Sequence, residues 1–304
     1  MGILIPLVVI SIIIAILNPV FLSMSNIIDV LRNTSFIIII SLGMTFVLIA
    51  RGLDLSVGSF VALMSLVVGL CMSAGIPVWL SIIITLLAGA VGGAFNALII
   101  VKFNVPSLIT TLGTMYMARG LVLILTQGVP IYPLPESFNA IGQESIAGIP
   151  YVLIIAVALS ILFSFILRKT VYGRMVYALG GNEETARLSG IKVNLIKTAV
   201  YIVVTTLSAL TGILIASRLG ASQPTIGEGY EMKVIASVII GGTSMSGGSG
   251  TILGSILGAL FMSVITNGMT LVGVSVYWQN FVVGFIIILA VIIDQSKRRI
   301  KGAN

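Results

Sequence analysis

Four charged residues, Arg174, Glu183, Glu184 and Arg187, lie in one central polar block, residues 174–190, RMVYALGGNEETARLSG. Asn182 is a favoured helix N-cap residue, and the carboxylates that follow it suit the positive end of a helix dipole. Glu183 and Arg187 are four residues apart with the acid first, which is the stabilising order on a helix. Gly190 suits the left-handed conformation that ends many helices. The block therefore predicts a polar helix of about two turns.

A helix of this length is marginal on its own, so something must pack against it. One interpretation is a solvated loop that only joins two longer elements. The other is a knob that docks on a partner protein in water. The residues that would form the knob are Asn182, Glu183, Glu184, Thr185, Ala186, Arg187 and Gly190.

A second polar group surrounds the sequence GLDLS, with Arg51 before it and Asp54 and Ser56 within it. Asp54 or Ser56 is expected to cap a helix that begins near Val57, and Arg51 is expected to offset the charge of the acid. A structural role of this kind and a part in gating are the two alternatives.

Catalytic and metal chemistry have few candidates in this chain. It contains no histidine, its single cysteine is Cys71, and its carboxylates do not cluster. The glycine-rich run GGTSMSGGSG at 241–250 lacks the Gly-Lys-Ser/Thr ending of a phosphate loop, so a flexible turn or close backbone packing is expected there. We expect no catalytic residue, no metal site and no cofactor bound by this chain.

The composition points to a lipid environment. Hydrophobic residues make up 58% of the chain, charged residues 8%, and the mean hydropathy is +1.20. Soluble domains carry about 25% charged residues. The net charge of +7 does not indicate nucleic acid, because the basic residues form no stripe with interleaved aromatic residues.

We therefore expect an all-α polytopic membrane protein, with residues 1–304 forming a single transmembrane domain of about ten helices. The apolar segments expected to form these helices are 3–22, 35–50, 57–75, 78–101, 106–126, 149–167, 198–217, 233–246, 251–271 and 275–294.

Three of these segments are candidates for lining a translocation path. Segments 35–50 and 233–246 are short for a span, and 106–126 is expected to be interrupted at Gly113, Arg119 and Gly120. Irregular backbone at membrane depth is tolerated only beside protein or a water-filled cavity. The polar residues that could line the path are Asn96, Thr110, Thr111, Arg119, Asn267 and Gln279. The alternative is that these residues bond to one another or to the backbone between helices.

The distribution of basic residues predicts the orientation. Ten spans put both termini on one side, and that side receives 12 of the 16 Lys and Arg residues, including the loop at about 168–197 and the tail Lys297, Arg298, Arg299 and Lys301. The segment 127–150 has no Lys or Arg and is expected to be external. We expect a bacterial-type cell (inner) membrane protein with both termini in the cytoplasm.

Two glycine pairs suggest an internal repeat. Gly89-x-x-x-Gly93 and Gly254-x-x-x-Gly258 favour close helix packing and fall on the fourth and ninth segments. An offset of five spans inverts the topology, so the spacing predicts a possible inverted repeat.

Over nearly its whole length the sequence resembles the permease subunits of ribose-type ABC importers. The resemblance rests on GLDLSVGS at 52–59, GRMVYALGGNEETARLSGIKVNLIK at 173–197, SRLGASQPTIGEGYEMKVIASVIIGGTSMSGG at 217–248 and GVSVYWQNFVVGFIIILAVIID at 273–294. Within the central block, Glu184-Thr185-Ala186 followed by Gly190 is similar to the Glu-Ala-Ala…Gly loop of ABC importer permeases. Thr185 departs from the middle alanine of that motif, and the glycine spacing is unusual.

The resemblance implies an import function for ribose or a related neutral sugar-like solute. It implies that the central block forms a coupling helix seated in a groove of a cytoplasmic ATPase subunit, which binds ATP-Mg and performs the hydrolysis. The implied partners are a second copy of this chain, two ATPase subunits and an extracytoplasmic sugar-binding protein.

An ion-coupled secondary transporter of a small polar solute is the alternative. Such transporters usually carry acidic residues or histidine within their spans. The nine acids of this chain fall in expected loops or at the edges of expected spans, which argues against ion coupling.

Overall fold

The computed structural model describes residues 3–302, and the side chains of all of these except 293–294 and 297–302. The described part is built of helices, with one short hairpin of strands β1 (Ser145–Ile146) and β2 (Ile149–Pro150). The helices are α1 (Leu4–Leu17), η1 (Pro19–Leu22), α2 (Met24–Ile49), α3 (Val57–Ser73), α4 (Val78–Lys102), α5 (Ser107–Thr126), α6 (Glu136–Gln143), α7 (Tyr151–Lys169), α8 (Val171–Gly181), α9 (Glu183–Leu188), α10 (Val193–Leu219), α11 (Tyr230–Ile240), α12 (Ile252–Leu271) and α13 (Val276–Gly302).

The length and apolarity of the helices agree with a polytopic membrane protein. Within residues 3–302, six helices are long and apolar enough to cross a membrane, namely α2, α4, α5, α7, α10 and α12. Each of the ten apolar segments contains a helix, but α1, α3, α11 and the apolar part of α13 are shorter than the other six. The expected number of ten spans therefore stays a prediction.

Two of the three expected irregular segments are regular helices, so those predictions were wrong. Helix α2 begins at Met24 rather than near residue 35, because Ser23 caps it and its polar first turns remain helical. Helix α5 runs without a break from Ser107 to Thr126. Helix α11 is short as expected, and it ends at Ile240.

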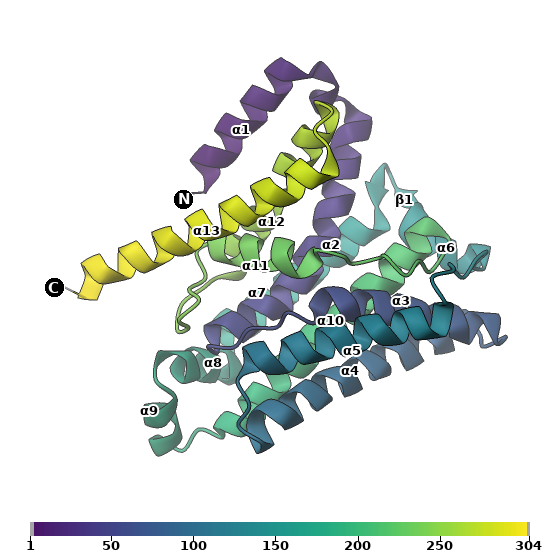
Figure 1. Ribbon diagram of the computed structural model, residues 1–304. Helices are drawn as coiled ribbons and strands as arrows, with labels where there is room; N and C mark the ends of the chain where they lie inside the picture. Colours follow the sequence, from purple (N-terminus) through teal and green to yellow (C-terminus); the bar gives the residue numbers. More distant parts are fainter. Residues whose placement is uncertain (1–2, 303–304) are drawn as a thin grey trace.

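Helices α2 and α10 form the centre of the molecule (Figure 1). Helix α10 packs against α2, α3, α4 and α6, and α2 packs also against α7, α11 and α12. The two central helices cross at Gly43, where a Cβ atom would lie 2.6 Å from the Cα atom of Val204. Since an unstrained side chain needs more room, glycine is required for this crossing.

Both predicted glycine pairs lie in tight helix contacts. A Cβ on Gly89 of α4 would lie 2.6 Å from the Cβ of Ala209 on α10, and one on Gly93 would lie 2.6 Å from the Cα of Ile202. On α12, Gly258 faces the carbonyl oxygen of Ser237 in α11. Small residues bring the helix backbones together at each contact, as expected for this motif in membranes.

The polar elements gather at the two ends of the helix bundle. Helices α8 and α9 lie on the same side of the molecule as the two labelled ends of the chain, and α6 and β1 lie on the opposite side (Figure 1). Two non-helical connections matter for the site: residues 50–56 between α2 and α3, and residues 220–229 between α10 and α11.

Candidate functional site

The predicted polar helix is present as α9, and its ends have the predicted chemistry. The Asn182 side chain accepts a hydrogen bond from the backbone N–H of Thr185 at 2.9 Å. Arg187 lies 3.3 Å from a carboxylate oxygen of Glu183. Gly190 has a φ of +82°, in the left-handed region. The local structure of the central block was therefore predictable from residue types and spacing.

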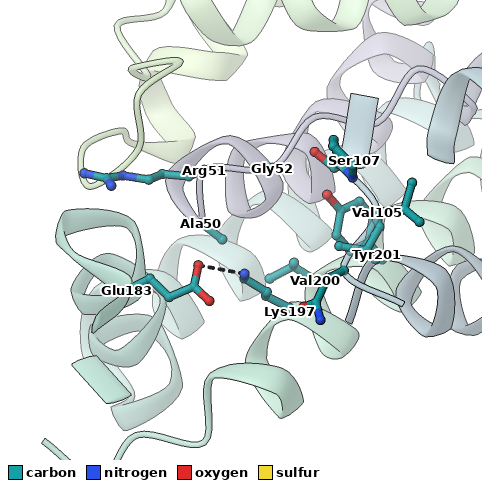
Figure 2. Close-up of a pocket in the computed structure, with 12 residues that line it drawn as sticks. Ala50, Arg51, Gly52, Val105, Ser107, Glu183, Lys197, Val200 and Tyr201 are labelled. Atoms are coloured by element: carbon teal, nitrogen blue, oxygen red, sulfur yellow. Dashed lines mark hydrogen bonds and ion pairs between the residues drawn. The ribbon is translucent and has the colours of Figure 1, made fainter. Parts of the chain in front are cut away.

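Two contacts hold α9 against the helices beside it. Ala186 is buried in the main apolar core. Lys197, at the start of α10, donates a hydrogen bond of 2.7 Å to Glu183 (Figure 2). Partial burial raises the pKa of Glu183, but the hydrogen bond and charge of Lys197 and the nearby charge of Arg187 outweigh this and hold that pKa below its ordinary value. The pairing with Lys197 was not foreseen, because 14 residues and a turn separate the two residues.

The outer surface of α9 is exposed and contains one large apolar side chain. Glu184, Thr185 and Arg187 are exposed, and Leu188 is 84% exposed. Leu188 is therefore a candidate for contact between α9 and another molecule. Sequence analysis missed Leu188. The available signal was one leucine at the end of an otherwise polar helix.

A pocket of about 350 Å³ lies between α9, the start of α10 and the connection between α4 and α5 (Figure 2). It is lined by the Glu183–Lys197 pair, by Tyr201, and by Ser107 at the start of α5. The end of α2 closes another side through Arg51. The pocket thus lies between α9 and the connection between α2 and α3.

The expected capping by Asp54 or Ser56 was wrong. Ser56 stands at the N-cap of α3, but its side chain makes no capping hydrogen bond. One carboxylate oxygen of Asp54 instead accepts from the backbone N–H of Ser56 at 2.8 Å and from its hydroxyl group. The Ser56 hydroxyl oxygen accepts from Asn96 at 3.1 Å. Asp54 therefore stabilises a local turn within the connection and does not cap α3.

Arg51 does not offset the charge of Asp54, which corrects the second part of that prediction. Its Nε donates to the carbonyl oxygen of Ser246 at 2.8 Å, and one terminal nitrogen donates to that of Gly181 at 2.6 Å. Within the described part of the chain Asp54 forms no salt bridge, and its second oxygen has no hydrogen-bond partner.

The candidate path residues are bonded to neighbouring groups at all but one position. Thr111 lies 3.1 Å from the backbone N–H of Leu55 and accepts its hydrogen bond. Asn267 and Asn26 exchange hydrogen bonds of 2.8 and 3.1 Å. Asn96, Arg119 and Gln279 donate to other groups of the chain, whereas the buried hydroxyl of Thr110 has no partner among residues 3–302. These contacts favour the structural alternative for most of the set.

Arg119 contacts the connection between α10 and α11. One terminal nitrogen donates to the carbonyl oxygen of Pro224 at 2.9 Å and to that of Ile226 at 3.4 Å. It also lies 3.9 Å from the exposed carboxylate of Glu228. A Cβ atom added at Gly113 or Gly120 of the same helix would have no other segment within 4 Å. The arginine therefore holds a non-helical segment from within a regular helix.

Comparisons with known proteins identify the relatives of this chain. Residues 26–291 match the family model described as branched-chain amino acid transport system / permease component. The ribose import permease protein RbsC of Bacillus subtilis is 42% identical over 95% of this chain and 90% of its own length. The corresponding protein of Haemophilus influenzae is 40% identical over 95% and 91%.

A relative of another name is more distant. The autoinducer 2 import system permease protein LsrC of Photorhabdus laumondii is 33% identical over 93% of this chain and 85% of its own length. No solved structure matches the chain. Since the family model covers most of the chain and the relatives align over almost all of it, this chain belongs to the ribose-type ABC importer permease family.

Proposed function

We propose that this chain is the membrane permease subunit of an ATP-driven importer of ribose or a related neutral sugar-like solute. The observation that carries the proposal is the alignment with two ribose import permeases at 40–42% identity over at least nine tenths of each protein. The polar candidates of the path carry hydroxyl, amide and guanidinium groups that hydrogen-bond sugars, although most bond within the chain in this conformation.

The coupling site in this proposal is α9 with its flanking residues Asn182 and Gly190. The exposed Glu184 and Leu188 would contact a cytoplasmic ATPase subunit, and that subunit would bind ATP-Mg and hydrolyse it. Support comes from the exposure of Leu188 and from the attachment of α9 to α10 through Glu183 and Lys197.

The assembly in this proposal contains two copies of this chain, two ATPase subunits and an extracytoplasmic sugar-binding protein. One chain offers one coupling helix, whereas ABC importers have two ATPase sites, so a second copy is needed. We propose an orientation in the bacterial inner membrane with both termini and α9 in the cytoplasm. The basic residues of the described cytoplasmic segments support it, and the side chains of Lys297, Arg298, Arg299 and Lys301 lie outside the described residues.

We also propose an inverted repeat that relates α2–α5 to α10–α13. Helix α10 packs against α3 and α4 as α2 packs against α11 and α12, and α3 packs against α5 as α11 packs against α13. The two glycine pairs are weaker support than this pairing of elements, because Gly93 contacts α10 whereas Gly258 contacts α11.

The test is reconstitution of the complex in proteoliposomes with its partner ATPase and sugar-binding protein from the same organism. We expect uptake of radiolabelled D-ribose that needs both ATP and the binding protein, and a permease to ATPase ratio of one to one. Uptake driven by a proton or sodium gradient without ATP would refute the proposal. A second, different permease in the complex would refute the homodimer.

A further inference from the structure

Three segments that are far apart in the sequence meet at Arg51. Its guanidinium group donates to the carbonyl oxygens of Gly181, at the end of α8, and of Ser246, in the loop between α11 and α12. The backbone N–H of Gly248 in that loop donates to the carbonyl oxygen of Ile49 at 2.9 Å. We call this meeting point of the ends of α2 and α8 with loop 242–250 the three-way junction.

The backbones in the three-way junction are in direct contact. A Cβ on Gly180 would overlap the carbonyl oxygen of Ile49 and lie 2.6 Å from the backbone nitrogen of Gly248. Tyr177 of α8 adds a hydrogen bond of 2.8 Å to the carbonyl oxygen of Gly250. The end of α8 is therefore in direct contact with the other two segments.

Each segment of the junction leads to a different part of the helix bundle. Helix α8 continues through Asn182 into α9, the proposed contact with the ATPase. The end of α2 continues through residues 50–56 into α3, and loop 242–250 joins α11 to α12. Arg51 itself has a φ of +61°, an uncommon conformation for a residue other than glycine. Figure 2 shows its side chain extended toward the loop and away from Tyr201.

We propose that Arg51 is the positioning residue that transmits the movement of the coupling helix to both pairs of helices, α2–α3 and α11–α12. This inference rests on the proposed coupling role of α9. Arg51 suits the task because its planar guanidinium group donates in two directions at once, which a lysine ammonium on a flexible stem does less well. Without it, α8 and α9 would still bind the ATPase, but their movement would reach the helix bundle only through the remaining contacts.

The experiment compares Arg51→Ala and Arg51→Lys in the full complex reconstituted with ATPase and binding protein. The measurements are copurification of the ATPase, the ATP hydrolysis rate and radiolabelled D-ribose taken up per ATP hydrolysed. We expect the Ala variant to keep the ATPase and its hydrolysis while uptake per ATP falls by about tenfold or more, and the Lys variant to be intermediate. Lys102→Ala, which changes an exposed basic residue at the end of α4 outside the central block, is the matched control and should behave as wild type.

Two adjacent glycines provide a second test that leaves every charge in place. Gly180→Ala should reproduce the uncoupling, because the added methyl group meets the backbone of Ile49. Gly181→Ala should not, because nothing lies within 4 Å of its Cβ position. Equal uptake per ATP in these two variants would contradict the role of the junction.

Different results would refute this inference and the proposed coupling role of α9. Glu184→Lys should lose the ATPase, and retention of the ATPase there would refute the coupling role of α9. If Arg51→Ala keeps full uptake per ATP, or if it loses the ATPase, the transmission role is refuted. Failure of both Arg51 variants to accumulate in the membrane would make Arg51 a folding residue and would refute it as well.

Discussion

The two adjacent glutamates of α9 have different surroundings. Glu183 faces inward, to Lys197 and Arg187, while Glu184 is exposed. Because the pKa of Glu183 is held below its ordinary value of 4.5, its attraction to Lys197 is fully present at neutral pH. The contribution is lost only as the pH falls through the acid range below that value. At neutral pH the ion pair between α9 and α10 is therefore charged.

Leu188 should contribute directly to binding of the ATPase. Replacement of this exposed leucine by serine, Leu188→Ser, leaves the packing of the chain unchanged and removes an apolar contact from the proposed interface. Burial of one leucine side chain is worth about 1.5–3 kcal/mol, so we expect affinity for the ATPase to fall by roughly tenfold or more. Titration of the detergent-solubilised permease with labelled ATPase measures this affinity.

The matched control is Val129→Ser, which changes an exposed apolar residue beyond the far end of α5 and should leave the affinity unchanged. An unchanged affinity in Leu188→Ser would remove that leucine from the interface.

Asp54 should be replaceable by asparagine. The acid is fully buried, forms no salt bridge within the described residues, and accepts two hydrogen bonds from Ser56 on one oxygen. A buried carboxylate without a cation is costly when charged, and Asp54→Asn keeps the acceptor without the charge. We expect near-normal membrane levels and ATP-driven uptake for this variant.

Asp54→Ala is the informative comparison, because it leaves the donors of Ser56 without an acceptor at a cost of about 1–3 kcal/mol. We expect reduced amounts of this variant in the membrane. Loss of transport in Asp54→Asn at a normal membrane level would instead point to a proton or cation carried at this acid.

At the scale of elements, an arginine holds each of two non-helical connections. One arginine lies at the beginning of its own connection, and the other lies on a helix that its connection does not join. Arg51 bonds the beginning of connection 50–56 to α8 and to loop 242–250. Arg119 of α5 bonds connection 220–229 through two carbonyl oxygens. Carbonyl groups outside a helix need donors, and a guanidinium group supplies several from one residue. Both connections are thereby kept ordered without being helical.

Arg119→Ala should loosen connection 220–229 while leaving α5 intact. Two hydrogen bonds from a charged donor are lost, at about 1.5–3 kcal/mol each, so we expect local amide exchange to rise by roughly tenfold or more. Hydrogen–deuterium exchange of the protein in lipid nanodiscs measures this segment by segment, with α6 as an internal reference.

Met117→Ala, an exposed residue two positions earlier on the same helix, serves as the control and should not change the exchange of 220–229. Equal exchange in the Arg119 and Met117 variants would show that the connection is held by other contacts.

The sequence predicted those elements whose signals are local. The cap at Asn182, the stop at Gly190 and the short α11 all depend on neighbouring residues. The predictions for α2 and α5 were wrong because they assumed that a helix ends or breaks where the apolar residues are interrupted. Polar residues such as Asn26 and Arg119 stay helical when the folded chain supplies partners for their side chains. The three-way junction could not be predicted, because its contacts join residues as far apart in the chain as Ile49 and Gly248.

At the scale of the whole molecule, polar elements gather at opposite ends of an apolar bundle. Helices α8 and α9 lie at the end toward which both termini point, and α6 and the hairpin lie at the other (Figure 1). The exposed side chains of the long helices between these ends include many large apolar residues, as contact with lipid requires.

Single cysteines at the two ends should therefore react from opposite sides of the membrane. In a chain with Cys71→Ser, we expect Glu136→Cys to be labelled by a membrane-impermeant thiol reagent in intact cells and Lys192→Cys to be labelled only after the cells are opened. Labelling of Lys192→Cys but not of Glu136→Cys in intact cells would reverse the proposed orientation.

The central position of α2 has a consequence for how the protein is made. This helix is almost completely enclosed by protein in the finished molecule, although it is apolar enough to span a bilayer. Its main central partner α10 ends at Leu219, which the ribosome reaches on the order of 10–30 s after Ile49 at roughly 5–20 residues per second. During that interval α2 must reside in lipid without α10. Its apolar residues thus serve two successive environments, first the bilayer before α10 is made and later the interior of the bundle, and substitutions that only the finished protein tolerates should fail at the earlier stage.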